Sequence, residues 1–123
     1  MARPKKWRKV CSLPATIEFT PIDSHNSFRD SIVMSVDEYE TIRLIDNENF
    51  SQKECSLYMK IARTTVQQIY FNARKKLARV LVEGLNLKIE GGEIVLCDGK
   101  ESYCGCGVCQ KHNYAIEYNK TEE

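Results

Sequence analysis

Four cysteines lie within thirteen residues near the C-terminal end of the sequence. Cys97, Cys104, Cys106 and Cys109 follow the spacing C-x6-C-x-C-x2-C, with a glycine on each side of Cys106. Four thiolates suit a tetrahedral zinc ion or an iron–sulfur cluster. Because glycines let a short loop wrap around an ion, this spacing predicts a metal site made by these four cysteines, with zinc or an iron–sulfur cluster as its cofactor.

Two further observations affect this prediction: the positions of the other two cysteines and the redox state of the compartment. Cys11 is far from the cluster in sequence but can approach it in space, whereas Cys55 falls on the buried side of an expected helix. The alternative to a metal site is a set of free or disulfide-forming thiols in a flexible C-terminal tail. Since the cytosol keeps thiols reduced, clustered cysteines in a cytosolic chain favour metal binding.

The segment from Arg63 to Lys75 carries side chains that can read and hold DNA. In the major groove arginine pairs with guanine, glutamine pairs with adenine, and threonine contacts the methyl group of thymine. Basic side chains further along a helix bind phosphates and position it. We predict a DNA-binding surface formed by Arg63, Thr64, Thr65, Gln67, Gln68, Phe71, Arg74 and Lys75. The alternative is a polar helix face that is only solvated.

Basic residues gather in parts of a nearly neutral sequence. The chain has 18 Lys and Arg against 17 Asp and Glu, which gives a formal net charge of +1. Residues 1–9 hold five basic residues and no acid, whereas acids gather in residues 37–54. A flexible basic arm can follow the DNA backbone or enter the minor groove. We predict this role for Arg3, Lys5, Lys6 and Arg8, with a solubilising tail as the alternative.

Two capping boxes indicate where the first two helices begin. Ser35 with Glu38 and Ser51 with Glu54 have the S-x-x-E spacing, in which each side chain binds the backbone N–H of the other residue. The apolar spacing that follows predicts two helices, over 35–46 and 51–59. Their expected inward side chains are Val36, Tyr39, Ile42, Ile45, Cys55, Tyr58 and Met59. Acids suit a helix start, so we interpret Asp37, Glu38 and Glu40 as capping and solvent-exposed residues.

The longest periodic segment runs over residues 63–83, and Gly84 fits its end. Its apolar stripe has three- and four-residue steps and consists of Val66, Ile69, Tyr70, Ala73, Leu77, Val80 and Leu81. Together with the helix over 51–59 and the short turn between them, it forms the helix-turn-helix pattern. The second helix of such a pair enters the major groove, and its N-terminal residues meet base edges.

Alternating apolar residues flank the sequence EGGE at positions 90–93. Two glycines supply the positive φ values of a tight turn, so this pattern predicts a β-hairpin over 87–97. The expected fold class is mainly α, a three-helix helix-turn-helix core followed by a small β-hairpin and a Cys-rich tail. The expected divisions are a basic N-terminal arm and loop (1–30), the helix-turn-helix domain (31–86), the hairpin (87–97) and a Cys-rich, partly disordered tail (98–123). Within the first division, a short strand is expected over residues 15–20.

Four segments of the sequence resemble a known family. They are MARPKK (1–6), VDEYETIRLID (36–46), RTTVQ (63–67) and IEGG (89–92). The family they resemble is a small prokaryotic family of predicted DNA-binding proteins of unknown role. Its helix-turn-helix is similar to the fourth conserved region of the primary sigma factors, which reads the −35 promoter element. The family pattern usually has Gly where Lys60 stands and Ser where Ala62 stands. The resemblance implies DNA binding and, through it, transcriptional regulation.

These observations favour one function class and leave a second open. The first is a transcriptional regulator that binds double-stranded DNA, modulated by its metal centre. The second is a metal or cluster carrier, or an adaptor, that uses the helical domain to dock another protein. RNA polymerase is a further candidate partner. A homodimer is also expected, through Leu77, Val80 and Leu81 or through the edge of the hairpin at Ile94–Leu96, with the alternative that these residues only complete the core of a monomer. With no catalytic constellation, signal peptide or 20-residue apolar stretch, we expect a cytoplasmic protein that is neither an enzyme nor membrane-bound.

Overall fold

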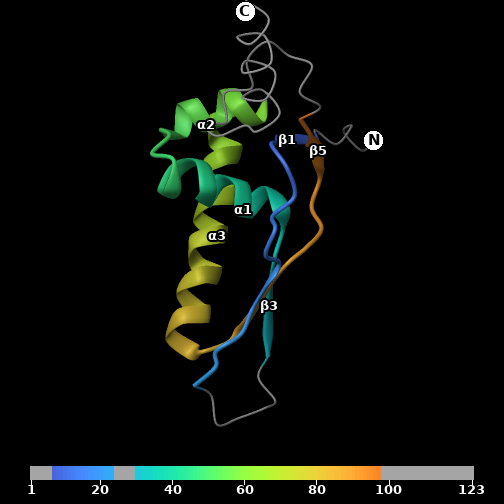
Figure 1. Ribbon diagram of the computed structural model, residues 1–123. Helices are drawn as coiled ribbons and strands as arrows, with labels where there is room; N and C mark the ends of the chain where they lie inside the picture. The colour runs from blue at the N-terminus through green and yellow to red at the C-terminus, as the bar shows by residue number, and fades with distance from the viewer. Residues whose placement is uncertain (1–6, 24–29, 98–123) are drawn as a thin grey trace, which may run out of the picture.

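One long helix runs along one side of the strands, and two shorter helices lie near its N-terminal end (Figure 1). The computed structural model describes residues 7–23 and 30–97. In this part of the chain the helices are α1 (Val36–Ile42), α2 (Gln52–Met59) and α3 (Arg63–Glu83), and a π-helical turn, η1 (Arg43–Asn47), continues α1. The strands are β1 (Arg8–Val10), β2 (Glu18–Phe19), β3 (Ser31–Met34), β4 (Asn86–Ile89) and β5 (Ile94–Leu96).

Both capping boxes are present, so the predicted helix starts are confirmed. The Ser51 hydroxyl accepts a hydrogen bond from the Glu54 N–H at 3.0 Å, and the Glu54 carboxylate accepts one from the Ser51 N–H at 3.0 Å. Ser35 and Glu38 make the same reciprocal pair at the start of α1. These local bonds satisfy N–H groups that a helix start leaves unpaired.

The two residues at which the sequence departs from the family pattern lie in the turn between α2 and α3. Lys60 takes the left-handed conformation, with φ of 59°, and ends α2. Ala62 precedes α3 and gives no side-chain hydrogen bond to it. The predicted bounds of α3 are confirmed, and Gly84, with φ of 64°, ends the helix.

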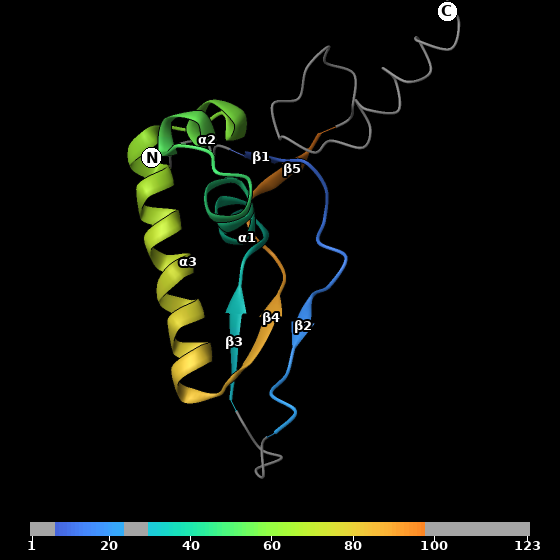
Figure 2. The same cartoon turned by 60° about the vertical axis from the view of Figure 1, so that its left-hand side comes forward.

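The predicted β-hairpin over residues 87–97 is wrong in its pairing. β4 pairs with β2 in antiparallel and with β3 in parallel orientation, whereas β5 pairs in parallel with β1. Figure 2 shows β3, β4 and β2 side by side, with β5 and β1 above them. β2 lies within the short strand predicted over residues 15–20, whereas β1 lies in the segment predicted to be a basic arm.

Contacts with α1 explain why the chain does not fold back after β4. The Glu90 N–H donates to the Met34 carbonyl, and the Val36 N–H donates to the Gly91 carbonyl, both at 2.9 Å. Gly92 has φ of 106°, and a Cβ atom there would clash with the carboxylate of Asp37. The two glycines thus let the backbone pass close to the start of α1. The described part of the chain is mixed α/β and not mainly α.

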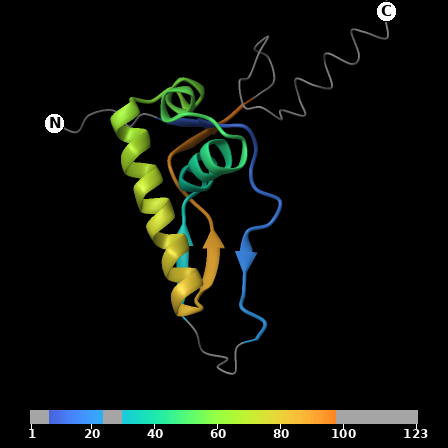
Figure 3. The same cartoon turned by 90° about the vertical axis from the view of Figure 1, so that its left-hand side faces the viewer.

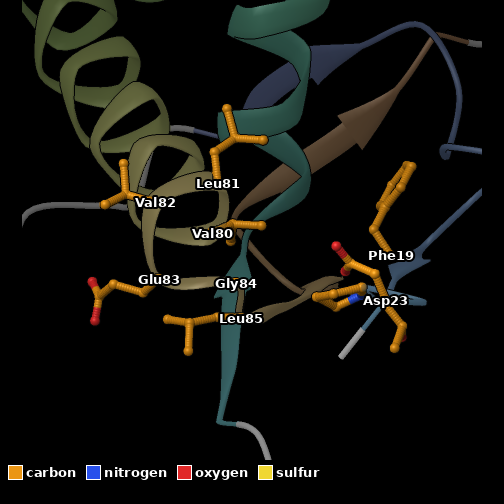
Figure 4. Close-up of a pocket in the computed structure, with 10 residues that line it drawn as sticks. Phe19, Asp23, Val80, Leu81, Val82, Glu83, Gly84 and Leu85 are labelled. Carbon is orange, nitrogen blue, oxygen red and sulfur yellow. The ribbon is translucent and has the colours of Figure 1, made fainter. Parts of the chain in front are cut away.

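The core lies where the three helices meet the strands, and α3 runs alongside β3 and β4 (Figure 3). The expected inward side chains of α2, Cys55, Tyr58 and Met59, are buried. Leu81 was predicted to belong to the buried apolar stripe of α3, but this is wrong because its side chain is 81% exposed. It lies at the edge of the helix face centred on Ala73, beside a surface hollow (Figure 4). No helix among the described residues has the length and apolar character needed to span a bilayer.

The acids at the start of α1 are buried, and the prediction that they face solvent is wrong. Glu40 is 1% exposed, and its carboxylate accepts hydrogen bonds from the Arg43 guanidinium at 2.7 and 3.0 Å and from the Cys11 N–H at 2.9 Å. Glu38 receives the Lys76 ammonium at 2.6 Å, and Asp37 lies 3.5 Å from the Arg8 guanidinium. A buried charge must be paired, so these contacts tie α1 to β1 and α3.

Replacement of Glu40 by alanine should strongly destabilise the fold. It leaves the Arg43 guanidinium and the Cys11 N–H without their acceptor, and loss of one partner of a buried ion pair costs about 3–5 kcal/mol. Urea unfolding measures this change. The matched control is Glu90→Ala, which breaks an exposed 3.6 Å pair with Lys88 and should change stability by about 0.5 kcal/mol or less. Equal losses in the two variants would contradict the role of Glu40.

Candidate nucleic-acid interface

α2, the turn and α3 form a helix-turn-helix in which one side of each helix is buried. α2 buries Cys55, Tyr58 and Met59, and α3 buries Val66, Ile69 and Ala73. Between the helices Ile61 is also buried, with an exposed fraction of 9%. Packing of these side chains fixes the angle at which α3 leaves the turn, and no other described element covers the opposite face of α3 (Figure 1).

The side chains predicted to contact DNA lie on this uncovered face. Gln67 and Gln68 are exposed, as are Arg63, Thr64, Phe71, Arg74 and Lys75, whereas Thr65 is half-buried. Three- and four-residue steps along a helix place side chains on one face. The prediction that Thr64, Gln67, Gln68 and Phe71 point outward is confirmed. We call Arg63, Thr64, Gln67, Gln68, Phe71, Arg74 and Lys75 the exposed α3 face.

Contacts beneath the exposed α3 face orient Arg74. Its guanidinium lies 5.4 Å from the centre of the Tyr70 ring, and the Tyr70 hydroxyl donates to Asp46 of η1 at 2.7 Å. Burial and this hydrogen bond raise the pKa of Tyr70, so the hydroxyl keeps its proton and its role as donor. The sequence assigned Tyr70 to the core, but the ring is half-buried and links α3 to the end of η1.

Two polar residues near this face were not among the residues predicted from the sequence to bind DNA. Gln52, at the start of α2, lines a hollow together with Gln67, Phe71 and Arg74. Asn72 accepts a hydrogen bond from the Gln68 side chain at 3.3 Å. The position of Gln52 directly after the capping residue Ser51 was the available signal, because the first helix of a helix-turn-helix crosses the DNA backbone.

Three basic residues of the described part of the chain are paired with acids and are therefore less available to bind DNA. Lys76 is bound to Glu38, Arg79 lies 2.8 Å from Glu83, and Lys88 lies 3.6 Å from Glu90. The exposed α3 face itself contains basic residues and no acid. Among the described residues, the exposed α3 face is therefore a basic surface that no acid of its own neutralises.

Arg8 is not part of a free basic arm, which corrects its predicted role. It lies in β1, its guanidinium is 3.4 Å from Glu93 and 3.5 Å from Asp37, and its N–H donates to the Glu93 carbonyl. Strand pairing with β5 holds Arg8 in this position. The other predicted arm residues, Arg3, Lys5 and Lys6, lie outside the described residues.

The sequence matches the family described as "Protein of unknown function DUF134" over residues 1–96. The chain belongs to the DUF134 family. A UPF0251 protein from Desulfitobacterium hafniense is 54% identical over 123 residues, which cover 100% of this chain and 98% of that relative. A UPF0251 protein from Caldanaerobacter subterraneus is 41% identical over 92 residues, 75% of this chain and 78% of the relative. No solved structure matches the chain.

The DUF134 match ends directly before the first cysteine of the predicted metal site. Cys97 is buried, and its N–H donates to the Val10 carbonyl at 2.8 Å. Cys104, Cys106 and Cys109 lie outside the described residues, and within the described residues no three metal-binding side chains come together. Burial, followed by the charge of Glu40, raises the pKa of Cys55 to about 12, which keeps that thiol protonated.

Glycine at position 60 should stabilise the turn before α3. Lys60 has a left-handed backbone, which costs an L-residue about 1–2 kcal/mol, so Lys60→Gly should raise the free energy of unfolding by about 1 kcal/mol after the entropy of glycine is included. Thermal unfolding measures the change. Lys53→Gly, inside the same helix α2, is the control and should lower stability by about 1 kcal/mol. A loss in both variants would rule out strain at Lys60.

Proposed function

We propose that the protein is a sequence-specific DNA-binding regulator of transcription that acts in the cytoplasm and inserts α3 into the major groove. The observation that carries this proposal is the exposed α3 face, which has amide and basic side chains and lies on the uncovered side of a packed helix-turn-helix. The resemblance to the DNA-reading region of sigma factors supports the same conclusion. No catalytic step is assigned to this face.

The start of α3 has the groups that base reading requires. Arg63 and Thr64 lie in its first turn, and Gln67 and Gln68 follow in the second turn, all of them exposed. The major groove of B-DNA is about 12 Å wide and accepts an α-helix. Gln67 and Gln68 suit adenine and Arg63 suits guanine, because their hydrogen-bonding groups match those base edges.

Phosphate contacts would fix the register of the helix. Arg74 and Lys75 lie two turns or more beyond Arg63 on the same face, where they suit the DNA backbone. Gln52 lies across the hollow that Arg74 lines, at the start of α2. Ala62 offers no side-chain cap, so the first N–H groups of α3 remain available to a phosphate oxygen.

Selection of bound sequences from random DNA, followed by gel-shift titration against salt, tests the proposal. A regulator selects a few sites and binds them with a steep salt dependence. A metal carrier or docking adaptor instead binds all DNA weakly and without preference. That second result would exclude sequence-specific reading by this chain.

Substitutions on α3 should separate base reading from phosphate binding. Gln67→Ala should weaken binding to the selected site by about ten-fold, because a bidentate base contact contributes about 1–3 kcal/mol of discrimination, and should leave binding to random DNA unchanged. Lys75→Ala should weaken binding to both DNAs and lower the salt slope by about 1. Competition gel shifts over a salt series measure both effects.

Lys88→Ala is the matched control for charge. Lys88 lies in β4 and pairs with Glu90, so its removal should change neither affinity nor salt slope. If Lys88→Ala reduces binding as much as Lys75→Ala does, net charge and not the exposed α3 face drives DNA binding. If Gln67→Ala weakens both DNAs equally, Gln67 has no role in base reading.

A further inference from the structure

The strands β2, β4 and β3 form the floor of an apolar hollow on the side along which α3 runs (Figure 3). Leu87 and Ile89 are two positions apart in β4, so their side chains lie on the same face of the strand. Phe19 of β2 pairs opposite Leu87. Met34 of β3 pairs opposite Ile89. Strand pairing thus gathers these four apolar side chains on one face, and all four line the hollow.

Two helices form the walls of this hollow. Their wall residues are three or four positions apart, which places them on one side of each helix, and they are Tyr39 and Ile42 of α1 and Leu77, Val80 and Leu81 of α3. The two walls are tied together, because the Glu38 carboxylate, directly before Tyr39, lies 2.6 Å from the ammonium of Lys76, directly before Leu77. We call the space between this floor and these walls the α1–α3 hollow.

The lining of the α1–α3 hollow is apolar throughout. Its volume is about 370 Å³, and no polar atom of the described residues lines it. Water in such a space finds no hydrogen-bond partner on the protein, so apolar groups replace it favourably. Small-molecule sites have volumes of about 300–1000 Å³, and an apolar cavity of about 150 Å³ already binds benzene. The α1–α3 hollow therefore has room for an apolar molecule larger than benzene.

We propose that the α1–α3 hollow is a binding site for a small uncharged molecule of aromatic or aliphatic hydrocarbon character. A charged or strongly polar ligand is disfavoured, because it would give up its hydration without receiving a hydrogen bond in return. The side chains of Phe19 and Leu81, which are 48% and 81% exposed, border the hollow, so a ligand can enter from solvent. Stable contact with a second copy of the chain would instead need about 800 Å² of surface from each partner, which is more than a recessed space of this volume offers.

A bound molecule would contact both α1 and α3. Leu77 of the hollow lies in the same helix as the exposed α3 face, about 15 Å along the axis from Gln67. A ligand that binds only the folded chain raises its stability, here by filling the space between the two helices. This inference goes beyond the proposed function and does not depend on it, because the binding assay contains no DNA.

Titration of the full chain with N-phenyl-1-naphthylamine tests the site. This uncharged aromatic amine fluoresces more strongly in apolar surroundings than in water. The wild-type chain should bind it saturably, with one molecule per chain, and saturation should raise the thermal unfolding temperature. Leu81→Glu should weaken binding about ten-fold, because it places a carboxylate that needs water at the edge of the hollow. Leu81 is exposed, so this variant should fold as the wild type does.

Val82→Glu is the matched control. Val82 follows Leu81 in α3, is 85% exposed and does not line the α1–α3 hollow, so the same change of charge there should leave probe affinity unchanged. Methyl NMR spectra of the wild-type chain locate the probe without any variant. The probe should shift the methyl signals of Leu87 and Ile89 and should leave those of Val66, in the core near the start of α3, unchanged.

Three results would overturn this proposal. The first is a wild-type chain that shows no saturable binding of the probe. The second is an equal loss of affinity in Leu81→Glu and Val82→Glu, which would show that the probe binds the exposed apolar surface of α3 and not the hollow. The third is a wild-type chain that sediments as a dimer and becomes a monomer in Leu81→Glu, which would place a second copy of the chain on this face. Probe binding that persists in a chain which fails to select DNA would support this site and contradict only the proposed function.

Discussion

The need to pair buried carboxylates at the start of α1 governs how the rest of the molecule is arranged. Glu38 holds Lys76 of α3, Glu40 holds Arg43 and the backbone of Cys11, and Asp37 lies beside Arg8 of β1. An unpaired charge in these positions would cost several kcal/mol. These pairs hold α1 against α3 and β1, and α2 and α3 pack on the core that this arrangement forms.

Some of the described cations are bound by acids within the fold, and others lie on its surface. Arg8, Arg43 and Lys76 are held by acids inside the fold, where they stabilise it. Arg63, Arg74 and Lys75 remain on the exposed α3 face. A chain with a net charge of only +1 thus presents a local basic surface without an excess of positive charge over the whole molecule, which is what local attraction of phosphate requires.

The strand order depends on the close approach of the backbone at Gly92 to the start of α1. Because Gly92 has no Cβ, the chain after β4 passes against Asp37 and the start of α1 and then runs on to pair with β1. The hydrogen bond from the Cys97 N–H to the Val10 carbonyl continues this parallel pair directly after the point where the DUF134 match ends.

The sequence alone determined the structural features that depend on residues three or four positions apart. The capping boxes at Ser35 and Ser51, the bounds of α3 and its uncovered side follow from spacings of three and four residues, and the structure confirms them. Only the tertiary structure decided the burial of Glu40, the ion pairs of Arg8, and the partners of β4 and β5. These features join residues that lie far apart in the chain, and burial changes the free energy of a charge in a way that local spacing does not reveal.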